Sequence, residues 1–282
     1  MTFEEVIGAY LSARLATERD RYSLKRLTPH FSGRSILDLR RADIRSYITA
    51  RQADGVKIST VRRELRIFSA AINFVRLEFD RPDLPNPVAA LGLEEGEGRV
   101  RWITRQEAAT LISASEEHAT RPHLACFIRL ALNTGCRKSE LLDLEWTRVD
   151  LDRAVLLLEA QHNKSKRRQT VPLNQDAVST LRRLKSWQEA HAPGTNWVFG
   201  REGGGKITTF KTGWTGALKR AGIDDFRIHD LRHTFASWLV MQGEDLYVVK
   251  ELLRHSSVTV TERYAHLAPT RTAIAVQRLL AF

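Results

Sequence analysis

The chain has 282 residues, which is more than most single compact domains contain and enough for two domains that each bury a core. Hydrophobic residues make up 43% and charged residues 27%, and this balance excludes a largely disordered chain. The 44 Lys and Arg residues outnumber the 33 Asp and Glu residues, so the net charge of +11 favours a polyanionic partner, with nucleic acid as the first candidate.

The positive charge is uneven along the chain. Residues 1–100 carry 17 basic and 14 acidic side chains, whereas the remaining residues carry 27 and 19. The stronger anion-binding surface is therefore expected in the second part. Composition alone leaves one alternative open, because many basic proteins bind no nucleic acid.

The cysteines and the N-terminal residues bear on the cellular compartment. Cys126 and Cys136 form neither a CxxC pair nor a zinc-type cluster, so we expect no disulfide framework and no structural metal. Residues 1–11 are acidic where a signal peptide would be basic, and no apolar run is long enough to cross a bilayer. We therefore expect a soluble, cytoplasmic protein with no membrane partner.

The first part of the chain is predicted to be helical. Thr2 and Glu5 have the spacing of a capping box that opens a first helix, and residues 43–51 predict another. A longer helix is predicted after Ser59, because apolar residues recur on one of its faces. These apolar residues are Val61, Leu65, Phe68, Ile72 and Val75.

Three arginines, Arg62, Arg63 and Arg66, fall on the opposite face of this longer helix. Their positive charge makes them candidate contacts to DNA. A face that is merely solvated is an equally good interpretation when the helix is judged alone.

A linker is predicted to separate two domains. Residues 81–99 collect three prolines, three glycines and an acidic cluster after a helical stretch, which is typical of a linker. We therefore expect a helical domain over residues 1–82, a linker over 83–99 and a second domain over 100–282. In the second domain, Thr104 and Glu107 form a capping box that opens a helix.

The second domain is predicted to combine helices with a small sheet. Helices are expected over about 104–115 and 122–133, the latter ended by Gly135 in a left-handed conformation. Short strands follow at 149–151, 154–158 and 169–173, with a strongly basic loop at 162–168 before the last strand. Further helices are expected near 207–221, 229–242, 245–254 and 259–266.

Arg137 stands at a predicted junction between a loop and a helix. There its guanidinium and the amides of the helix N-terminus could both face a phosphate. An ion pair with Glu140, three residues later, is the structural alternative.

His229 and Arg232 are three residues apart, so on a helix their side chains project from one face. A polar surface helix would explain the same pattern. His229 and His233 also have the spacing of two zinc ligands, but the intervening residues lack the Glu of a His-Glu-x-x-His site. Because no third ligand is evident either, a metal site is disfavoured.

Tyr264 follows His255 by nine residues. Taken alone, it would be assigned to the core, because a phenol with a pKa of about 10 is a poor nucleophile at neutral pH. The order of the candidate residues changes this interpretation.

The succession of Arg137, a lysine in a hairpin loop, His229-x-x-Arg232, His255 and Tyr264 resembles the catalytic domain of the tyrosine recombinases, the family of phage integrases and Xer-like enzymes. The resemblance covers about residues 100–270 and includes Thr134-Gly-x-Arg, the strand Val171-Pro-Leu and the motif His229-x-Leu-Arg-His-Thr. It implies a mainly α fold with a small antiparallel sheet. It also implies a two-domain architecture, in which a helical core-binding domain precedes a mixed α/β catalytic domain.

The resemblance also implies the chemistry. Tyr264 would attack a DNA phosphate to form a 3′-phosphotyrosyl bond, and Arg137 and Arg232 would bind the non-bridging oxygens. His229 would act as an acid or base near the proton of Tyr264, His255 would bind the phosphate and Glu140 would orient these groups. No cofactor, metal or ATP is required.

The family's catalytic lysine lies seven residues before the valine of the Val-Pro-Leu strand, which selects Lys164 as general acid for the 5′-oxygen. Lys166, Arg167 and Arg168 in the same loop are candidate DNA contacts. One position departs from the family pattern, because Arg254 stands where glycine usually precedes the histidine equivalent to His255. This departure could alter the local backbone.

The implied partners are double-stranded DNA and three further copies of the chain, which would form a tetramer on DNA for integration, excision or resolution. An apolar tail could pack on a neighbouring copy or equally on its own domain; it contains Ile274, Val276, Leu279, Leu280 and Phe282. Three alternative functions are a topoisomerase of type IB acting as a monomer, a DNA-binding regulator without activity, and a metal-dependent nuclease.

Overall fold

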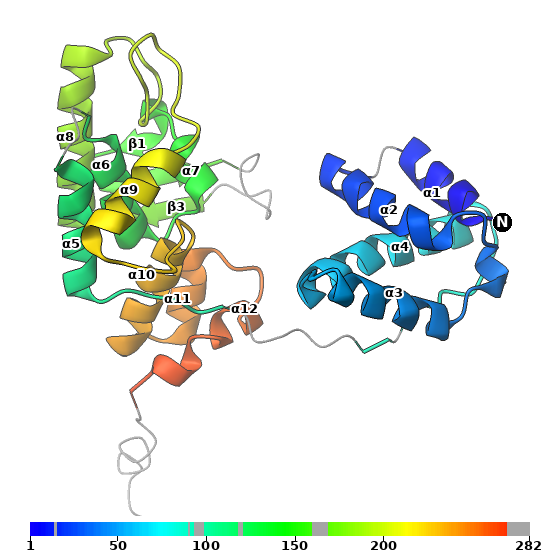
Figure 1. Ribbon diagram of the computed structural model, residues 1–282. Coiled ribbons are helices and arrows are strands. Elements are labelled where there is room, and N and C mark those ends of the chain that lie inside the picture. Colours follow the sequence, from blue (N-terminus) through cyan, green and yellow to red (C-terminus); the bar gives the residue numbers. More distant parts are fainter. Residues whose placement is uncertain (14–15, 90, 93–98, 118–120, 160–168, 270–282) are drawn as a thin grey trace, which may run out of the picture. The chain divides into compact units, whose positions relative to one another are not determined.

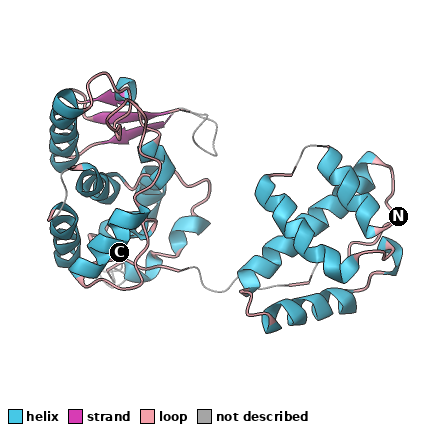
Figure 2. Ribbon diagram, turned by 45° about the horizontal axis from the view of Figure 1, so that its top comes forward, coloured by secondary structure: helices cyan, strands magenta, loops and turns pink. Residues whose placement is uncertain are grey.

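A computed structural model describes residues 1–269 apart from 14–15, 90, 93–98, 118–120 and 160–168 (Figures 1 and 2). The chain divides into two compact units, Met1–Gly98 and Arg99–Phe282, and each is considered by itself. In the part of the chain that is described, no helix is both long and apolar enough to cross a membrane.

Unit 1 is a bundle of helices around α4 (Ile58–Glu78). Helices α1 (Phe3–Ser12), α2 (Glu18–Phe31) and α3 (Arg41–Ala53) all pack against it, and a short 3₁₀ turn, η1 (Ile36–Asp38), precedes α3. The capping box of Thr2 and Glu5 is confirmed. The apolar face predicted for α4 is also confirmed, because its five residues are buried in the core of this unit.

Unit 2 contains the sheet and most of the helices (Figure 2). The predicted helices α5 (Arg105–Glu116) and α6 (His123–Thr134) are confirmed, and the short α7 (Lys138–Leu142) follows them. The three predicted strands form one antiparallel sheet in the order β1 (Val149–Asp150), β2 (Val155–Leu158) and β3 (Gln169–Pro172). The remaining helices are α8 (Gln175–His191), α9 (Lys211–Ala221), α10 (Asp230–Met241), α11 (Leu246–Leu253) and α12 (Thr259–Glu262).

Helix α6 is the central element of unit 2, and it packs against α5, α8 and α10. Ten of its twelve residues are buried, as expected for a helix that is apolar on nearly all of its faces. Helix α6 ends at Gly135, which has φ +60°, and a Cβ there would lie 2.4 Å from Cδ1 of Phe235. Glycine is therefore required both for the backbone and for the close approach of α10.

Two helix boundaries differ from the prediction. Helix α9 begins at Lys211 rather than near 207, because the amide of Ile207 donates a hydrogen bond to the carbonyl of Phe199 and holds that segment extended. The helix expected over 259–266 divides into α12 and a 3₁₀ turn, η4 (Ala265–Leu267). The amide of Tyr264 bonds to the carbonyl three residues earlier, so the chain tightens at this tyrosine.

Candidate active site

Arg137 and Glu140 form a capping box at the start of α7. The amide of Arg137 donates to Oε2 of Glu140 at 2.7 Å, and Nη1 of the guanidinium donates to Oε1 at 2.6 Å. The carboxylate is almost fully buried, whereas 32% of the Arg137 side chain is exposed. The ion pair considered from the sequence is therefore present, and it holds the guanidinium at an accessible position.

Arg232 connects three elements of unit 2. Its side chain is buried on α10, and its two terminal nitrogens donate to the carbonyls of Gly135, at 2.7 Å, and Leu253. These carbonyls end α6 and α11, so Arg232 brings the segment before Arg137 next to the segment before His255. The pKa of Arg232 is lowered by burial and by the positive charges of Arg137 and Arg254. An anion bound among these arginines would relieve their mutual repulsion.

Arg254 ends α11 with φ 59° and ψ 44°, a left-handed conformation. The backbone thus takes the form that glycine adopts easily at the end of a helix, and the arginine does not divert it. The next residue, His255, places Nδ1 2.9 Å from Oγ1 of Thr261. Burial, together with the charges of Arg232 and Arg137, lowers the pKa of His255 to about 3, so its ring is neutral at pH 7.

Tyr264 is buried, and its phenol oxygen lies 2.5 Å from Nδ1 of His233. Burial raises the pKa of Tyr264 to about 12. Burial and the neighbouring His229 lower the pKa of His233 to about 4. At neutral pH a protonated phenol therefore faces a neutral imidazole.

His229 contacts the ring of His233. Its ring is perpendicular to the ring of His233, with the centroids 5.2 Å apart. The pKa of His229 is lowered by desolvation and by the charge of Arg232. From the sequence, His233 was considered as a zinc ligand and as part of the His229-x-Leu-Arg-His-Thr motif, but its contact with Tyr264 was missed. The four-residue spacing from His229, which places both rings on one face of α10, was the available signal.

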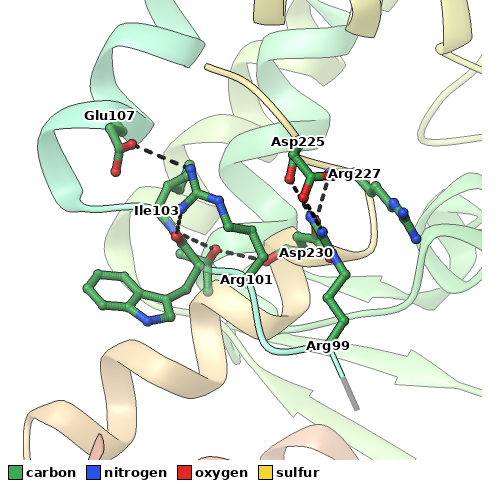
Figure 3. Close-up of polar contacts among 9 residues, drawn as sticks. Arg99, Arg101, Ile103, Glu107, Asp225, Arg227 and Asp230 are labelled. Atoms are coloured by element: carbon green, nitrogen blue, oxygen red, sulfur yellow. Dashed lines mark hydrogen bonds and ion pairs between the residues drawn. The ribbon is translucent and has the colours of Figure 1, made fainter. Parts of the chain in front are cut away.

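A segment that precedes α5 fixes the start of α10 (Figure 3). Arg99 donates to the buried carboxylate of Asp230 at 2.8 Å and to Asp225 at 2.5 Å. The same carboxylate of Asp230 accepts the amide of Arg227 at 2.9 Å. Since Asp230 follows His229 directly, these contacts fix the turn that carries His229.

The backbone of Ile103, which precedes α5, makes two hydrogen bonds to side chains farther along α10. Its amide donates to Oγ1 of Thr234 at 3.3 Å, and its carbonyl accepts Nε1 of Trp238 at 2.9 Å. The segment from Arg99 to Ile103 therefore holds the helix that carries Arg232 and His233.

The other residues singled out from the sequence lie outside the described residues or in unit 1. Lys164, Lys166, Arg167 and Arg168 lie outside the described residues, as do Ile274, Val276, Leu279, Leu280 and Phe282. On α4 in unit 1, Arg66 is exposed, Arg62 is partly buried, and Arg63 pairs with Asp20 at 3.1 Å. Among the described residues, no group of three or more His, Cys, Asp or Glu side chains could hold a metal ion.

Comparison with known sequences gives consistent matches. The model of the phage integrase family matches residues 101–271. Tyrosine recombinase XerD of Caulobacter vibrioides is 31% identical over 261 residues, which are 88% of this chain and 84% of that protein. The integrase of Salmonella phage P22 is 38% identical over 184 residues, which are 61% of this chain but only 45% of that protein.

Comparison with solved structures shows the fold. The Tn1549 transposon integrase in complex with circular intermediate DNA matches 99% of this chain and 100% of that chain, with a TM-score of 0.80 and 17% identity. A lambda integrase dimer bound to a COC′ core site matches 96% of this chain and 97% of its own, with a TM-score of 0.75 and 19% identity. The predicted fold, mainly α with a small antiparallel sheet, is confirmed.

Proposed function

The chain belongs to the phage integrase family of tyrosine recombinases, and on this premise we propose that it cleaves and rejoins duplex DNA at specific sites through a 3′-phosphotyrosyl intermediate. Unit 1 would serve as the core-binding domain and unit 2 as the catalytic domain. The net charge of +11 suits a DNA partner.

One observation supports the proposal more than any other. Two successive residues of α10 join the distant parts of the candidate site: Arg232 bonds to the ends of α6 and α11, and His233 bonds to Tyr264. Four separate segments are thereby linked: the ends of α6 and α11, helix α10 and the segment that carries Tyr264. Such convergence of a nucleophile, permanent cations and neutral imidazoles is what transfer of a phosphoryl group requires.

In the proposed reaction, Arg137 and Arg232 bind the non-bridging oxygens of the scissile phosphate, where negative charge grows in the transition state. The phenol oxygen of Tyr264 forms a bond to phosphorus while the bond from phosphorus to the 5′-oxygen breaks. The phenol proton passes to the neutral ring of His233, whose ring contacts that of His229 edge to face. Lys164 supplies the proton that the leaving 5′-oxygen takes up, since an ammonium can release a proton and a guanidinium effectively cannot.

The geometry sets one further requirement. Only 2% of Tyr264 is exposed, so α12 and the turn that follows it must shift before the phenol can reach a phosphate. His255, bonded to Thr261 of α12, would then be released to donate a hydrogen bond to the phosphate. Four protomers would assemble on two duplexes in the cytoplasm to exchange strands.

The test is trapping of the covalent adduct. The protein is incubated with a duplex nicked beside the cleavage site, so that a short strand diffuses away and rejoining is prevented. We expect an adduct that resists denaturant and forms in excess EDTA, whereas Tyr264→Phe should bind the DNA and form none, because only the nucleophilic oxygen is lost. Binding without an adduct by the unaltered chain would favour the regulator, and dependence on magnesium would favour the nuclease.

A further inference from the structure

Arg254 is an unusual residue for its place in the fold. Its backbone has φ 59°, a left-handed conformation that costs a side chain with a Cβ free energy and costs glycine none. Its side chain is only 4% exposed, and Nε is buried without a hydrogen-bond partner. A strained backbone and a buried, unpaired nitrogen both cost stability. Their occurrence beside a candidate site indicates that the side chain has a function there.

The guanidinium of Arg254 serves that function through Glu140. Nη2 donates to Oε2 of Glu140 at 2.8 Å, and Nη1 donates to the carbonyl of Leu252 at 2.7 Å. The same Oε2 accepts the amide of Arg137 at 2.7 Å, while Oε1 accepts the Arg137 guanidinium. Glu140 therefore bridges a buried arginine on one side and a partly exposed arginine on the other.

The charge balance shows why the buried arginine matters. Burial alone would raise the pKa of Glu140, but the charge of Arg254 and the donors of Arg137 lower it below its usual value. Without Arg254, the charged form of Glu140 would depend on Arg137 alone. The Arg137 side chain is 32% exposed, so its charge is partly screened by water. With Arg254 in place, the carboxylate stays charged and has one fixed orientation.

We propose that Arg254 is a positioning residue for DNA cleavage: it anchors the buried carboxylate of Glu140, which in turn fixes the guanidinium of Arg137 at the scissile phosphate. This inference rests on the proposed function. It assigns the departure from the family's glycine to the site, since a glycine would end α11 equally well and without strain.

The test compares Arg254→Gly with a matched control. Ala154, in the turn between β1 and β2, also has a positive φ, 53°, but carries no charge. Both Arg254→Gly and Ala154→Gly relieve a left-handed residue, so Ala154→Gly should unfold close to the temperature of the unaltered protein. Arg254→Gly also removes the buried partner of Glu140, so it should unfold at a lower temperature, and cleavage is compared where each variant is folded.

Cleavage should separate the two variants. We expect Arg254→Gly to slow adduct formation on saturating nicked DNA by about a hundredfold with little change in DNA affinity, as a misplaced cation would. Ala154→Gly should cleave at the rate of the unaltered chain, and Arg254→Lys should recover part of the loss because it keeps the charge. An Arg254→Gly variant that cleaves bound DNA at the full rate would overturn the proposal.

A second measurement does not depend on activity. The carboxyl carbon of Glu140 is followed by NMR against pH, with its signal assigned by its loss in Glu140→Gln. We expect the titration midpoint of Glu140 to rise in Arg254→Gly. If the unaltered chain forms no adduct, the proposed function fails, yet the link from Arg254 to Glu140 is still decided. An unchanged midpoint would overturn the inference in either case.

Discussion

The phenol oxygen of Tyr264 lies 2.5 Å from Nδ1 of His233, and both side chains are buried. The phenol has a raised pKa and the imidazole a lowered one, so the proton rests on oxygen before reaction. His233 is then the group to which this proton can pass, and its ring also contacts the ring of His229.

We expect His233→Asn to slow adduct formation by about a hundredfold or more at pH 7, the usual scale for a lost proton acceptor. The amide oxygen of asparagine can still accept a hydrogen bond from the phenol, but it cannot take the proton. Single-turnover rates on nicked DNA between pH 6 and 9.5 would measure this, and the defect should diminish as hydroxide removes the phenol proton. Wild-type rates in His233→Asn would limit His233 to orienting the phenol.

The depressed pKa of His233 also predicts how stability depends on pH. The folded value of about 4 lies below the ordinary value of 6.5, so between these values the unfolded chain binds more protons. The contribution of His233 to stability is therefore complete above pH 6.5 and is lost as the pH falls toward 4, by up to about 3 kcal/mol at about 1.4 kcal/mol per pKa unit.

Urea unfolding from pH 4 to 7 would check this contribution. Replacing His233 by Asn removes the titration, so the difference in unfolding free energy between the two proteins should change with pH over this window. A constant difference would show that His233 keeps an ordinary pKa in the folded protein.

Lys164 and Lys166 should differ when each is replaced by alanine. If Lys164 is the general acid, Lys164→Ala slows cleavage by about a hundredfold or more, and a substrate with sulfur at the bridging 5′ position restores the rate because a thiolate leaves unprotonated. Lys166→Ala should instead weaken binding and lower its salt dependence. Equal defects without rescue by sulfur would reduce Lys164 to a phosphate contact.

Asp230 and Asp225 both contact Arg99, but their exposure differs, with 3% and 71% of the side chain exposed. Asp230→Asn should lower the unfolding free energy by about 1–3 kcal/mol, because it weakens charged hydrogen bonds in a buried place. It should also slow cleavage, since the turn that carries His229 loosens.

Asp225→Asn is the matched control for this change and should affect stability much less, because an exposed ion pair contributes little. Urea unfolding and adduct formation of both variants would give the comparison. Similar losses in the two variants would contradict the role of the Arg99–Asp230 contact in fixing α10.

The sequence by itself determined the local features of this protein. The capping box at Thr2, the apolar face of α4, the glycine that ends α6 and the alternating strands of the sheet all depend on neighbours within a few residues. Local backbone preferences and hydrophobic periodicity are sufficient for such features. The order of the motifs was sufficient to identify the family.

Only the tertiary structure decided how these motifs meet. Tyr264 and His233 are 31 residues apart, Arg254 and Glu140 are 114 apart, and Arg99 and Asp230 are 131 apart. No periodicity connects positions so distant, because each contact depends on how α10 and α11 pack beside the end of α6. Burial in that packing also sets the pKa values of Tyr264 and His233, since desolvation is a property of the folded site and not of the residue type.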